Sequence, residues 1–214
     1  MNNYIEWSRV KGIVFDIGNV LIDIDYVNTV LQFQKLSNQD FGKIVSYSSQ
    51  IEFFNQYERG EINTAEFIAA IKKYLKPEVT DAEIVAAWNT MLVNYPAQKI
   101  HLLEQLKSDF KLFALSNINE MHINLMDTNI KRLYGKETFG EYFDKAFYSN
   151  EIGMRKPEKR IYDYLVSETG ISAEHLLFFD DKKENLIPAS AIGIQTIHME
   201  KPEQLYSFFE HFFE

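Results

Sequence analysis

The stretch "VKGIVFDIGNVLIDID", residues 10–25, decides the fold. Residues 10–15 are apolar and rich in β-branched side chains, which predicts a buried strand, and the next residue is Asp16. Gly18 and Asn19, two strong turn-forming residues, follow almost at once. A carboxylate at the tip of a buried strand is costly unless a cation or hydrogen-bond donors meet it. Asp16 is therefore a candidate functional residue.

The composition is that of a globular protein, since 46% of the 214 residues are hydrophobic and 25% are charged. This length holds one sizeable domain, or a core domain with a smaller second unit. The net charge of −9 repels nucleic acid and anionic lipid, so neither is an expected partner. The chain has no cysteine, no signal-peptide pattern at its start and no run near the ~20 apolar residues of a membrane span, so we expect a cytoplasmic protein.

From residue 97 onward, strand-like and helix-like segments alternate along the chain. This alternation predicts an α/β fold in three layers, with a Rossmann-like parallel sheet covered by helices on both faces. After the first strand, the expected strands are residues 110–117, 145–153, 176–181 and 193–199. The expected helices are residues 97–107, 119–133, 157–169 (with Pro157 at its first position) and 185–191, followed by an aromatic helix near the C-terminus.

The part of the chain between Asp25 and Tyr95 reads as all-helical. Asn-x-x-Glu at residues 63–66 and Thr-x-x-Glu at residues 80–83 have the form of capping boxes, and each opens a run of apolar residues at helical spacing. We therefore predict that residues 23–94 form a helical unit inserted into an α/β core domain made of residues 1–22 and 95–214.

Polar residues stand at the ends of three of the expected strands. They are Asp16, the pair Ser116 and Asn117, and the pair Asp180 and Asp181. In an open parallel sheet, ligands bind outside the carboxyl ends of the strands, so these side chains meet if their strands are neighbours. Each alone is as well explained as a turn or a helix cap. The three together favour a functional site.

Lys156 adds a cation to this set. It stands immediately before the helix expected at Pro157, so its ammonium and the N-terminus of that helix are expected to face an anion together. The alternative is a solvated loop charge, which is the usual place of a lysine. We interpret the neighbouring Arg155 as such a loop charge.

Four motifs in order carry a resemblance to a known family: "DIGNVL" after the first strand, then "LSN", "RKP" before a helix, and "FFDD". They resemble the motifs of the haloacid dehalogenase superfamily, and the helical unit lies where that superfamily places its small cap domain. Within the superfamily, the chain is most similar to the sugar-phosphatase branch typified by α-D-glucose-1-phosphate phosphatase. The resemblance spans nearly the whole chain.

The resemblance implies a Mg²⁺-dependent phosphatase that hydrolyses a small phosphorylated metabolite, a sugar phosphate above all, through an aspartyl-phosphate intermediate. It assigns the nucleophile to Asp16. The implied Mg²⁺ ligands are Asp16, Asp181 and the backbone carbonyl of Gly18, with Asp180 as a further ligand or as an orienting residue. The implied phosphate-binding groups are Ser116 Oγ, the Asn117 backbone N–H and Lys156, which also stabilises charge in the transition state.

One position departs from the family pattern. Most phosphatases of the superfamily carry an acid two residues after the nucleophile, and here that residue is Gly18. Asp23 and Asp25 are possible replacements, although we expect them to cap the helix that begins at Tyr26. His122 is a weaker candidate for the same role.

Two other functions stay open. The first is a dehalogenase, which the scarcity of basic residues between Asp16 and Arg59 disfavours; the second is a non-catalytic protein that binds phosphorylated ligands. The sequence does not show which polar residues of the inserted unit line a pocket and which lie on its surface. Among them are Tyr47, Asn55, Glu58, Arg59 and Trp88. The sequence does not give the oligomeric state either.

Overall fold

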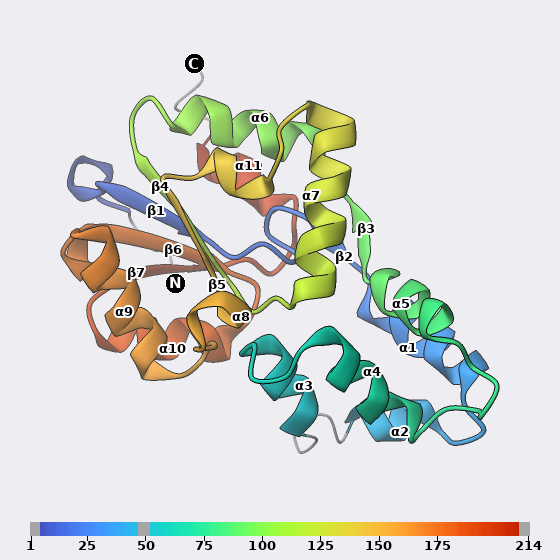
Figure 1. Cartoon of the computed structure of the whole chain (residues 1–214). Helices are drawn as coiled ribbons and strands as arrows, with labels where there is room; N and C mark the ends of the chain where they lie inside the picture. Colours follow the sequence, from blue (N-terminus) through green and yellow to red (C-terminus); the bar gives the residue numbers. More distant parts are fainter. Residues whose placement is uncertain (1–4, 47–51, 210–214) are drawn as a thin grey trace.

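A computed structural model describes residues 5–46 and 52–209 of the chain. At its centre is a five-stranded sheet with the strand order β5-β4-β1-β6-β7, in which all neighbours are parallel (Figure 1). The strands are β1 (Gly12–Phe15), β4 (Lys111–Ser116), β5 (Lys145–Tyr148), β6 (Leu176–Asp180) and β7 (Gln195–His198). The predicted parallel sheet is confirmed.

The central strand is β1, and its four residues are completely or almost completely buried. Its last residue, Phe15, pairs with Ala114 of β4 on one side and with Phe179 of β6 on the other. The chain runs from β1 outward to β4 and β5, then crosses to β6 and β7 on the opposite side. The strand order therefore reverses between β1 and β6, the place where open α/β sheets bind ligands.

Helices cover both faces of the sheet, and β1 divides its side chains between them. Ile13 and Phe15 belong to an apolar cluster shared with one set of helices, whereas Val14 belongs to a second cluster on the other face. The first set is α6 (Ala97–Leu106), α7 (Glu120–Tyr134) and α11 (Gln204–Phe209). The other face carries α9 (Lys159–Thr169) and α10 (Lys183–Ala191), with the short α8 (Ser149–Ile152) after β5 (Figure 1). This alternation produces the predicted three layers.

The helical insert comprises α1 (Tyr26–Leu36), α2 (Phe41–Ser46), α3 (Glu52–Glu58), α4 (Thr64–Lys72) and α5 (Asp81–Asn89). It lies to one side of the sheet in Figure 1 and has its own apolar cluster, which includes Phe33, Phe67 and Ile84. Both predicted capping boxes are present, at the N-termini of α4 and α5. None of the helices in the described ranges combines the length and apolar character needed to cross a membrane.

Three errors stand out among the sequence-based boundaries. Between Asp25 and Tyr95 the chain is not all-helical, because it contains β3 (Leu92–Asn94), which pairs with β2 (Asp23–Ile24) where the insert joins the core. The segment predicted as a strand at 145–153 turns into α8 after Tyr148. The helix predicted to begin at Pro157 begins at Lys159. Strands of two or three residues are too short to show a period, and the other two errors lie at element ends.

Candidate active site

Asp16 lies directly after β1, at the reversal point of the sheet. Its backbone N–H donates to the carbonyl of Phe179 in β6 (2.8 Å), and its Oδ1 accepts from the N–H of Ile17 (2.8 Å). The residue is only 8% exposed. Burial is the main reason that the pKa of Asp16 is raised to about 6, and the nearby Asp180 and Asp181 add to it against the opposing charge of Lys156.

Asp180 and Asp181 follow at the end of β6 and meet Asp16 there. One carboxylate oxygen from each of the three residues lies within 4.8 Å of the others. Asp180 is fully buried, and its oxygens accept hydrogen bonds from Lys156 Nζ, the Lys182 N–H and Asn185 Nδ2. Asp181 is partly exposed. Oxygen ligands in such a cluster are those that Mg²⁺ prefers.

Lys156 is not the solvated loop charge that the alternative interpretation describes. Only 1% of its side chain is exposed, and Nζ lies 3.0 Å from Asp16 Oδ1 and 2.6 Å from Asp180 Oδ2. Burial alone would lower the pKa of Lys156, but the two carboxylates outweigh it and raise the pKa above its ordinary value. Because α9 begins only at Lys159, two turn residues separate Lys156 from that helix.

Asn117 holds the backbone of Lys156 in place. Its Nδ2 donates to the carbonyl of Lys156 and its Oδ1 accepts from the Lys156 N–H, both at 2.8 Å. The side-chain amide therefore fixes the loop that carries the lysine. Ser116, the last residue of β4, is buried and lines the same cavity as Asp16 and Lys156.

The structure adds two residues that the sequence had not singled out as functional. Asn19 has a left-handed backbone (φ 56°), and its Nδ2 donates to Asp181 Oδ2 (3.1 Å). Asn185, on α10, donates to both oxygens of Asp180. Each orients one acid of the cluster. A signal for Asn19 existed, because asparagine tolerates the left-handed conformation; Asn185 looks like any residue near the start of a helix.

Asp23 and Asp25, the candidates to replace the acid that is absent at Gly18, both have structural partners. Asp25 caps α1 as expected, accepting from the Asn28 N–H (2.8 Å). The same expectation was wrong for Asp23, which lies in β2 and is held by Lys99 (3.2 Å) and Asn94 (3.1 Å). Neither aspartate is among the described residues that line the cavity.

His122 does line the cavity, but its ring is occupied. Nε2 lies 3.1 Å from the carbonyl of Trp88 and therefore donates to it, while Nδ1 accepts from Asn119 Nδ2 (3.2 Å). The Trp88 ring stacks on the imidazole. Burial lowers the pKa of His122 to about 4, so the ring is neutral near pH 7 and is a poor proton donor.

A cavity of about 630 Å³ joins these residues to the insert. At the core end it is lined by Asp16, Gly18, Asn19, Ser116, Asn117, Lys156, Asp181, Lys182 and Asn185. The insert supplies a largely apolar wall, from Tyr26, Val30, Phe33, Phe41, Phe54, Trp88 and Met91. Asn55 and Glu58 of the insert also line it, whereas Tyr47 lies outside the described residues.

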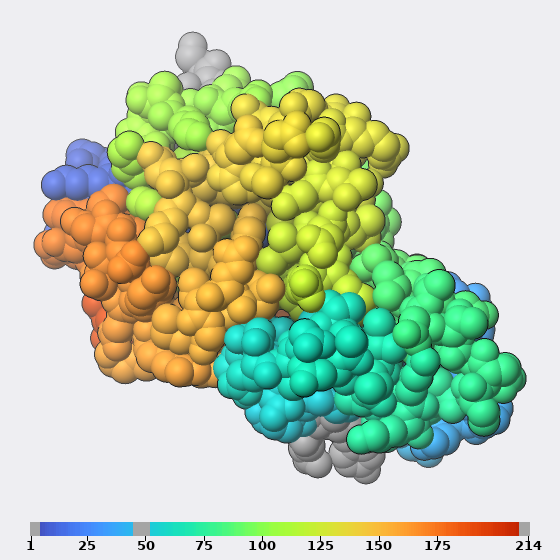
Figure 2. Space-filling view, in the orientation of Figure 1, coloured from blue at the N-terminus to red at the C-terminus, as the bar shows by residue number. Residues whose placement is uncertain are grey.

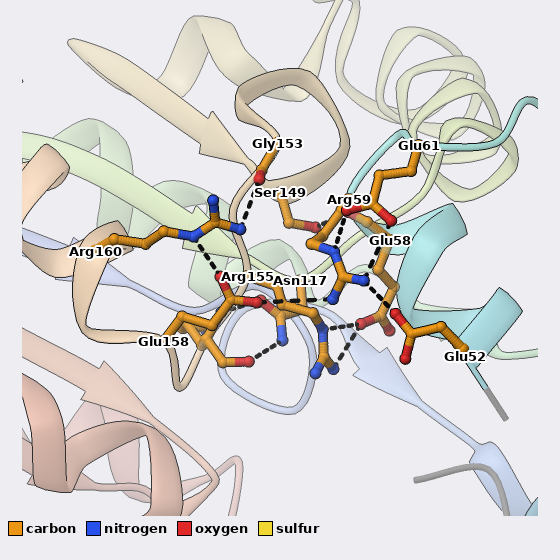
Figure 3. A network of polar contacts seen from close by, with 11 residues as sticks. Glu52, Glu58, Arg59, Glu61, Asn117, Ser149, Gly153, Arg155, Glu158 and Arg160 are labelled. Atoms are coloured by element: carbon orange, nitrogen blue, oxygen red, sulfur yellow. Dashed lines mark hydrogen bonds and ion pairs between the residues drawn. The ribbon is translucent and has the colours of Figure 1, made fainter. Parts of the chain in front are cut away.

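Ion pairs join the insert to the core beside this cavity (Figure 3). Arg155 of the core donates from Nε (2.9 Å) and Nη2 (2.8 Å) to Glu58 of the insert, so its interpretation as a free loop charge was wrong. Arg59 pairs with Glu52 and Glu61, and lies 3.7 Å from Glu158 of the core. Figure 2 shows the cyan surface of the insert in continuous contact with the orange surface of the core.

A parallel sheet with an acid-lysine cluster at its reversal point and a helical insert over it defines a class of hydrolases. The chain belongs to the haloacid dehalogenase-like hydrolase family, whose sequence model matches residues 10–193. It is therefore an enzyme of that family, as the resemblance of its motifs predicted.

Two relatives that match over most of their length are named as phosphatases. D-ribitol-5-phosphate phosphatase of Bacteroides thetaiotaomicron is 27% identical over 191 residues, which cover 89% of this chain and 92% of the relative. A sesquiterpene phosphatase of Aspergillus oryzae is 28% identical over 195 residues, covering 90% and 91%. A crystal structure of a family enzyme from B. thetaiotaomicron in complex with magnesium and inorganic phosphate superposes with a TM-score of 0.80 at 31% identity, covering 88% and 93%. The likeness to the glucose-1-phosphate branch stays a prediction.

Proposed function

We propose that the protein is a Mg²⁺-dependent phosphatase that hydrolyses a small phosphorylated metabolite, a sugar or polyol phosphate, through an aspartyl-phosphate on Asp16. The observation that carries this proposal is the contact of Lys156 with Asp16 inside a cavity that also contains Ser116, Asn117 and Asp181. Both phosphatase relatives support the hydrolysis of a phosphate ester, and the one named for D-ribitol 5-phosphate supports a polyol phosphate as the substrate class.

The two oxygens of Asp16 differ in their surroundings. Oδ1 accepts from the Ile17 N–H and from Lys156, whereas no hydrogen bond from a described residue reaches Oδ2. Oδ2 is therefore the atom that attacks phosphorus, forming a P–O bond to Asp16 while the bond to the leaving oxygen breaks. Water then attacks the phosphorus and releases phosphate, which restores the carboxylate.

The donor set fits Mg²⁺, because its side-chain oxygens are carboxylates and the surrounding loop offers a backbone carbonyl. Asp16, Asp181 and the carbonyl of Gly18 would hold the ion, and Asp180 belongs to the same cluster although its oxygens already have donors. When bound, the cation supplies the positive charge that lets a carboxylate approach a phosphate dianion.

The remaining phosphate oxygens need donors from the protein. Ser116 Oγ lies at the end of β4 and the backbone N–H of Asn117 directly after it. Lys156 brings a charge that is fixed by its neighbours before the substrate arrives. Donors that are already in position stabilise the charge on the phosphoryl group without reorganising in the transition state.

We further propose that residues 23–94 act as the cap, with residues 1–22 and 95–214 forming the core domain. The apolar cluster of the insert supports this division, since Met121 of α7 is its one described member from the core. The cap covers the leaving group, because its helices line the end of the cavity away from the acid cluster. Specificity between phosphorylated metabolites then depends on this wall.

Phosphate release tests the proposal. Purified protein is assayed on a panel of sugar, polyol and aryl phosphates with Mg²⁺ and with excess EDTA, beside the variants Asp16→Asn and Asp25→Asn. We expect turnover that requires the metal, is lost in Asp16→Asn, and is kept in Asp25→Asn, where only a helix cap changes. Halide release from a 2-haloacid with EDTA present would instead establish a dehalogenase. Binding of phosphate esters without any turnover would establish a phospho-ligand-binding protein.

A further inference from the structure

The ion pair between Glu58 and Arg155 forms part of the cavity wall. Both residues line the cavity, and both side chains are partly buried. Arg155 directs Nε and Nη2 at one oxygen of Glu58, Oε2 (Figure 3). No described residue bonds the second oxygen of Glu58 or Nη1 of Arg155. Each member of the pair therefore keeps one polar atom for a ligand.

The pair is held in position from both sides. Glu58 ends α3, and its carbonyl accepts from Ser149 Oγ (2.6 Å). Ser149 is fully buried, and its Oγ also accepts from the N–H of Ile118, the residue after Asn117. Arg155 directly precedes Lys156. Both charges are thus tied to the loops that contribute the phosphate-binding groups, which fixes their position relative to a bound phosphate.

The other charged residues that line the cavity lie at its core end, in or next to the acid cluster. The charged residues among the described lining residues are Asp16, Glu58, Arg155, Lys156, Asp181 and Lys182. Asp16, Lys156 and Asp181 belong to the acid cluster, and Lys182 directly follows it in the chain. Glu58 and Arg155 are therefore the charged groups beside the leaving group, and their charges cancel.

We propose that Glu58 is a specificity-determining residue that neutralises Arg155, so that the enzyme favours esters with a neutral, hydroxylated leaving group over esters that carry a second anionic group. This inference rests on the proposed phosphatase function. Oε1 of Glu58 accepts from a hydroxyl and Nη1 of Arg155 donates to one. A carboxylate or second phosphate on the leaving group meets the Glu58 charge and gains nothing from an arginine that is already paired.

The competing explanation is that the Glu58–Arg155 pair only holds the insert against the core. The neighbouring contacts distinguish between this explanation and a role in specificity. Arg59 of the insert also reaches Glu158 of the core at 3.7 Å, and neither residue is among the described residues that line the cavity. Docking of the insert thus has an ion pair outside the pocket. The Glu58–Arg155 pair differs from it in lining the cavity.

The test uses two phosphate esters of the same carbon skeleton, a pentitol 5-phosphate and the pentonic acid 5-phosphate, whose far end is a hydroxymethyl group or a carboxylate. The ratio of their kcat/KM values is measured, together with their inhibition constants against p-nitrophenyl phosphate hydrolysis. We expect the full-length enzyme with Mg²⁺ to favour the neutral ester about tenfold, because a carboxylate loses hydration on entering the cavity and the paired arginine does not compensate for it.

The variants change this ratio in opposite directions. Glu58→Gln leaves Arg155 unpaired and should lower the ratio of kcat/KM for the neutral ester to that for the anionic ester by about tenfold. Arg155→Gln leaves the Glu58 charge unbalanced and should raise this ratio. Glu52→Gln removes the same charge from the same helix outside the cavity and should leave the ratio unchanged. Melting temperatures show whether each variant is folded.

An unchanged ratio in folded Glu58→Gln and Arg155→Gln, or equal losses on both esters, would show a structural pair and overturn the inference. Failure of either ester to compete with p-nitrophenyl phosphate in an active enzyme would overturn it as well. If p-nitrophenyl phosphate itself is not hydrolysed with Mg²⁺, the proposed phosphatase function fails instead, and the specificity role fails with it.

Discussion

The ammonium of Lys156 lies 2.6 Å from the carboxylate of Asp180, and both side chains are almost completely excluded from solvent. A buried ion pair is costly to break, because removal of one partner leaves the other charged without compensation. Asp16, 3.0 Å from the same ammonium, is a second carboxylate that depends on it.

Replacement of this lysine should therefore damage stability and catalysis together. We expect Lys156→Met, which keeps length and removes charge, to lower the free energy of unfolding by about 3–5 kcal/mol and to lower kcat/KM. Urea unfolding without added metal and steady-state kinetics measure the two effects. Lys159→Met, at an exposed pair with Asp163, is the control and should change stability by less than ~1 kcal/mol. Unchanged stability in Lys156→Met would contradict the buried-pair argument.

Metal binding should depend on the orientation of Asp181. We expect Asp181→Ala to raise the Mg²⁺ concentration for half-maximal activity steeply. Asn19→Gly, which removes the hydrogen bond to Asp181 without straining the left-handed backbone, should raise it by about 10- to 100-fold. Mg²⁺ should also raise the melting temperature of the parent protein, because it binds the folded carboxylate cluster. Full activity in excess EDTA would refute the metal site.

Gly18 offers no proton to the leaving oxygen, so hydrolysis should depend on leaving-group pKa. We expect kcat to rise as the leaving-group pKa falls across a series of aryl and alkyl phosphates. Gly18→Asp should speed the poor leaving groups by up to ~10²-fold. The site accepts a side chain, because its φ is not left-handed and an added Cβ would lie 3.1 Å from the flexible end of Ile24. Gly18→Asn is the matched control without an acid. A flat dependence, with the chemical step rate-limiting, would point to another proton donor.

His122 should make the protein less stable in mild acid. Its pKa is about 4 in the folded protein, below the ordinary value of 6.5, so the unfolded chain binds the extra proton first. The stability due to the neutral ring is complete above pH 6.5 and is lost as the pH falls toward 4, by roughly 3 kcal/mol. Urea unfolding from pH 7 to pH 4 should show a shallower loss in His122→Gln than in the parent. His101→Gln, at an exposed position, should follow the parent. If the free energy of unfolding fell equally with pH in all three proteins, the lowered pKa of His122 would be contradicted.

Gly60 should be needed for docking of the insert. Its φ is +67°, and an added Cβ would lie 2.1 Å from the backbone oxygen of Asn150 in the core. Gly170 has a similar φ of +64° with nothing near an added Cβ, so Gly170→Ala should cost only the ~1–2 kcal/mol of a left-handed alanine. We expect Gly60→Ala to cost clearly more in urea unfolding and to make the insert more sensitive to proteases. If Gly60→Ala and Gly170→Ala lowered the free energy of unfolding equally, this would show that the insert shifts away from Asn150 at no cost.

The sequence predicted the sheet and the acid cluster because both follow local rules. A buried run such as residues 10–15 is visible without its partners, and polar residues at strand ends converge in any parallel sheet. Contacts between residues far apart in the sequence are not visible in this way. Nothing near Arg155 in the sequence reveals that Glu58 lies opposite it, and the side chain of Asn185 gains meaning only because it lies beside Asp180.

The placement of β1 at the centre of the sheet has a consequence for the order in which the newly synthesised chain folds. Gly12 pairs with Lys111 on one side and with Leu176 on the other, so both neighbours of the first strand leave the ribosome long after it does. The insert has an apolar cluster and local helices, which can form before β1 has paired with β4 and β6. β1 is thus synthesised well before both of its neighbours and is completed only when β6 has followed. During that interval its apolar residues are exposed to aggregation.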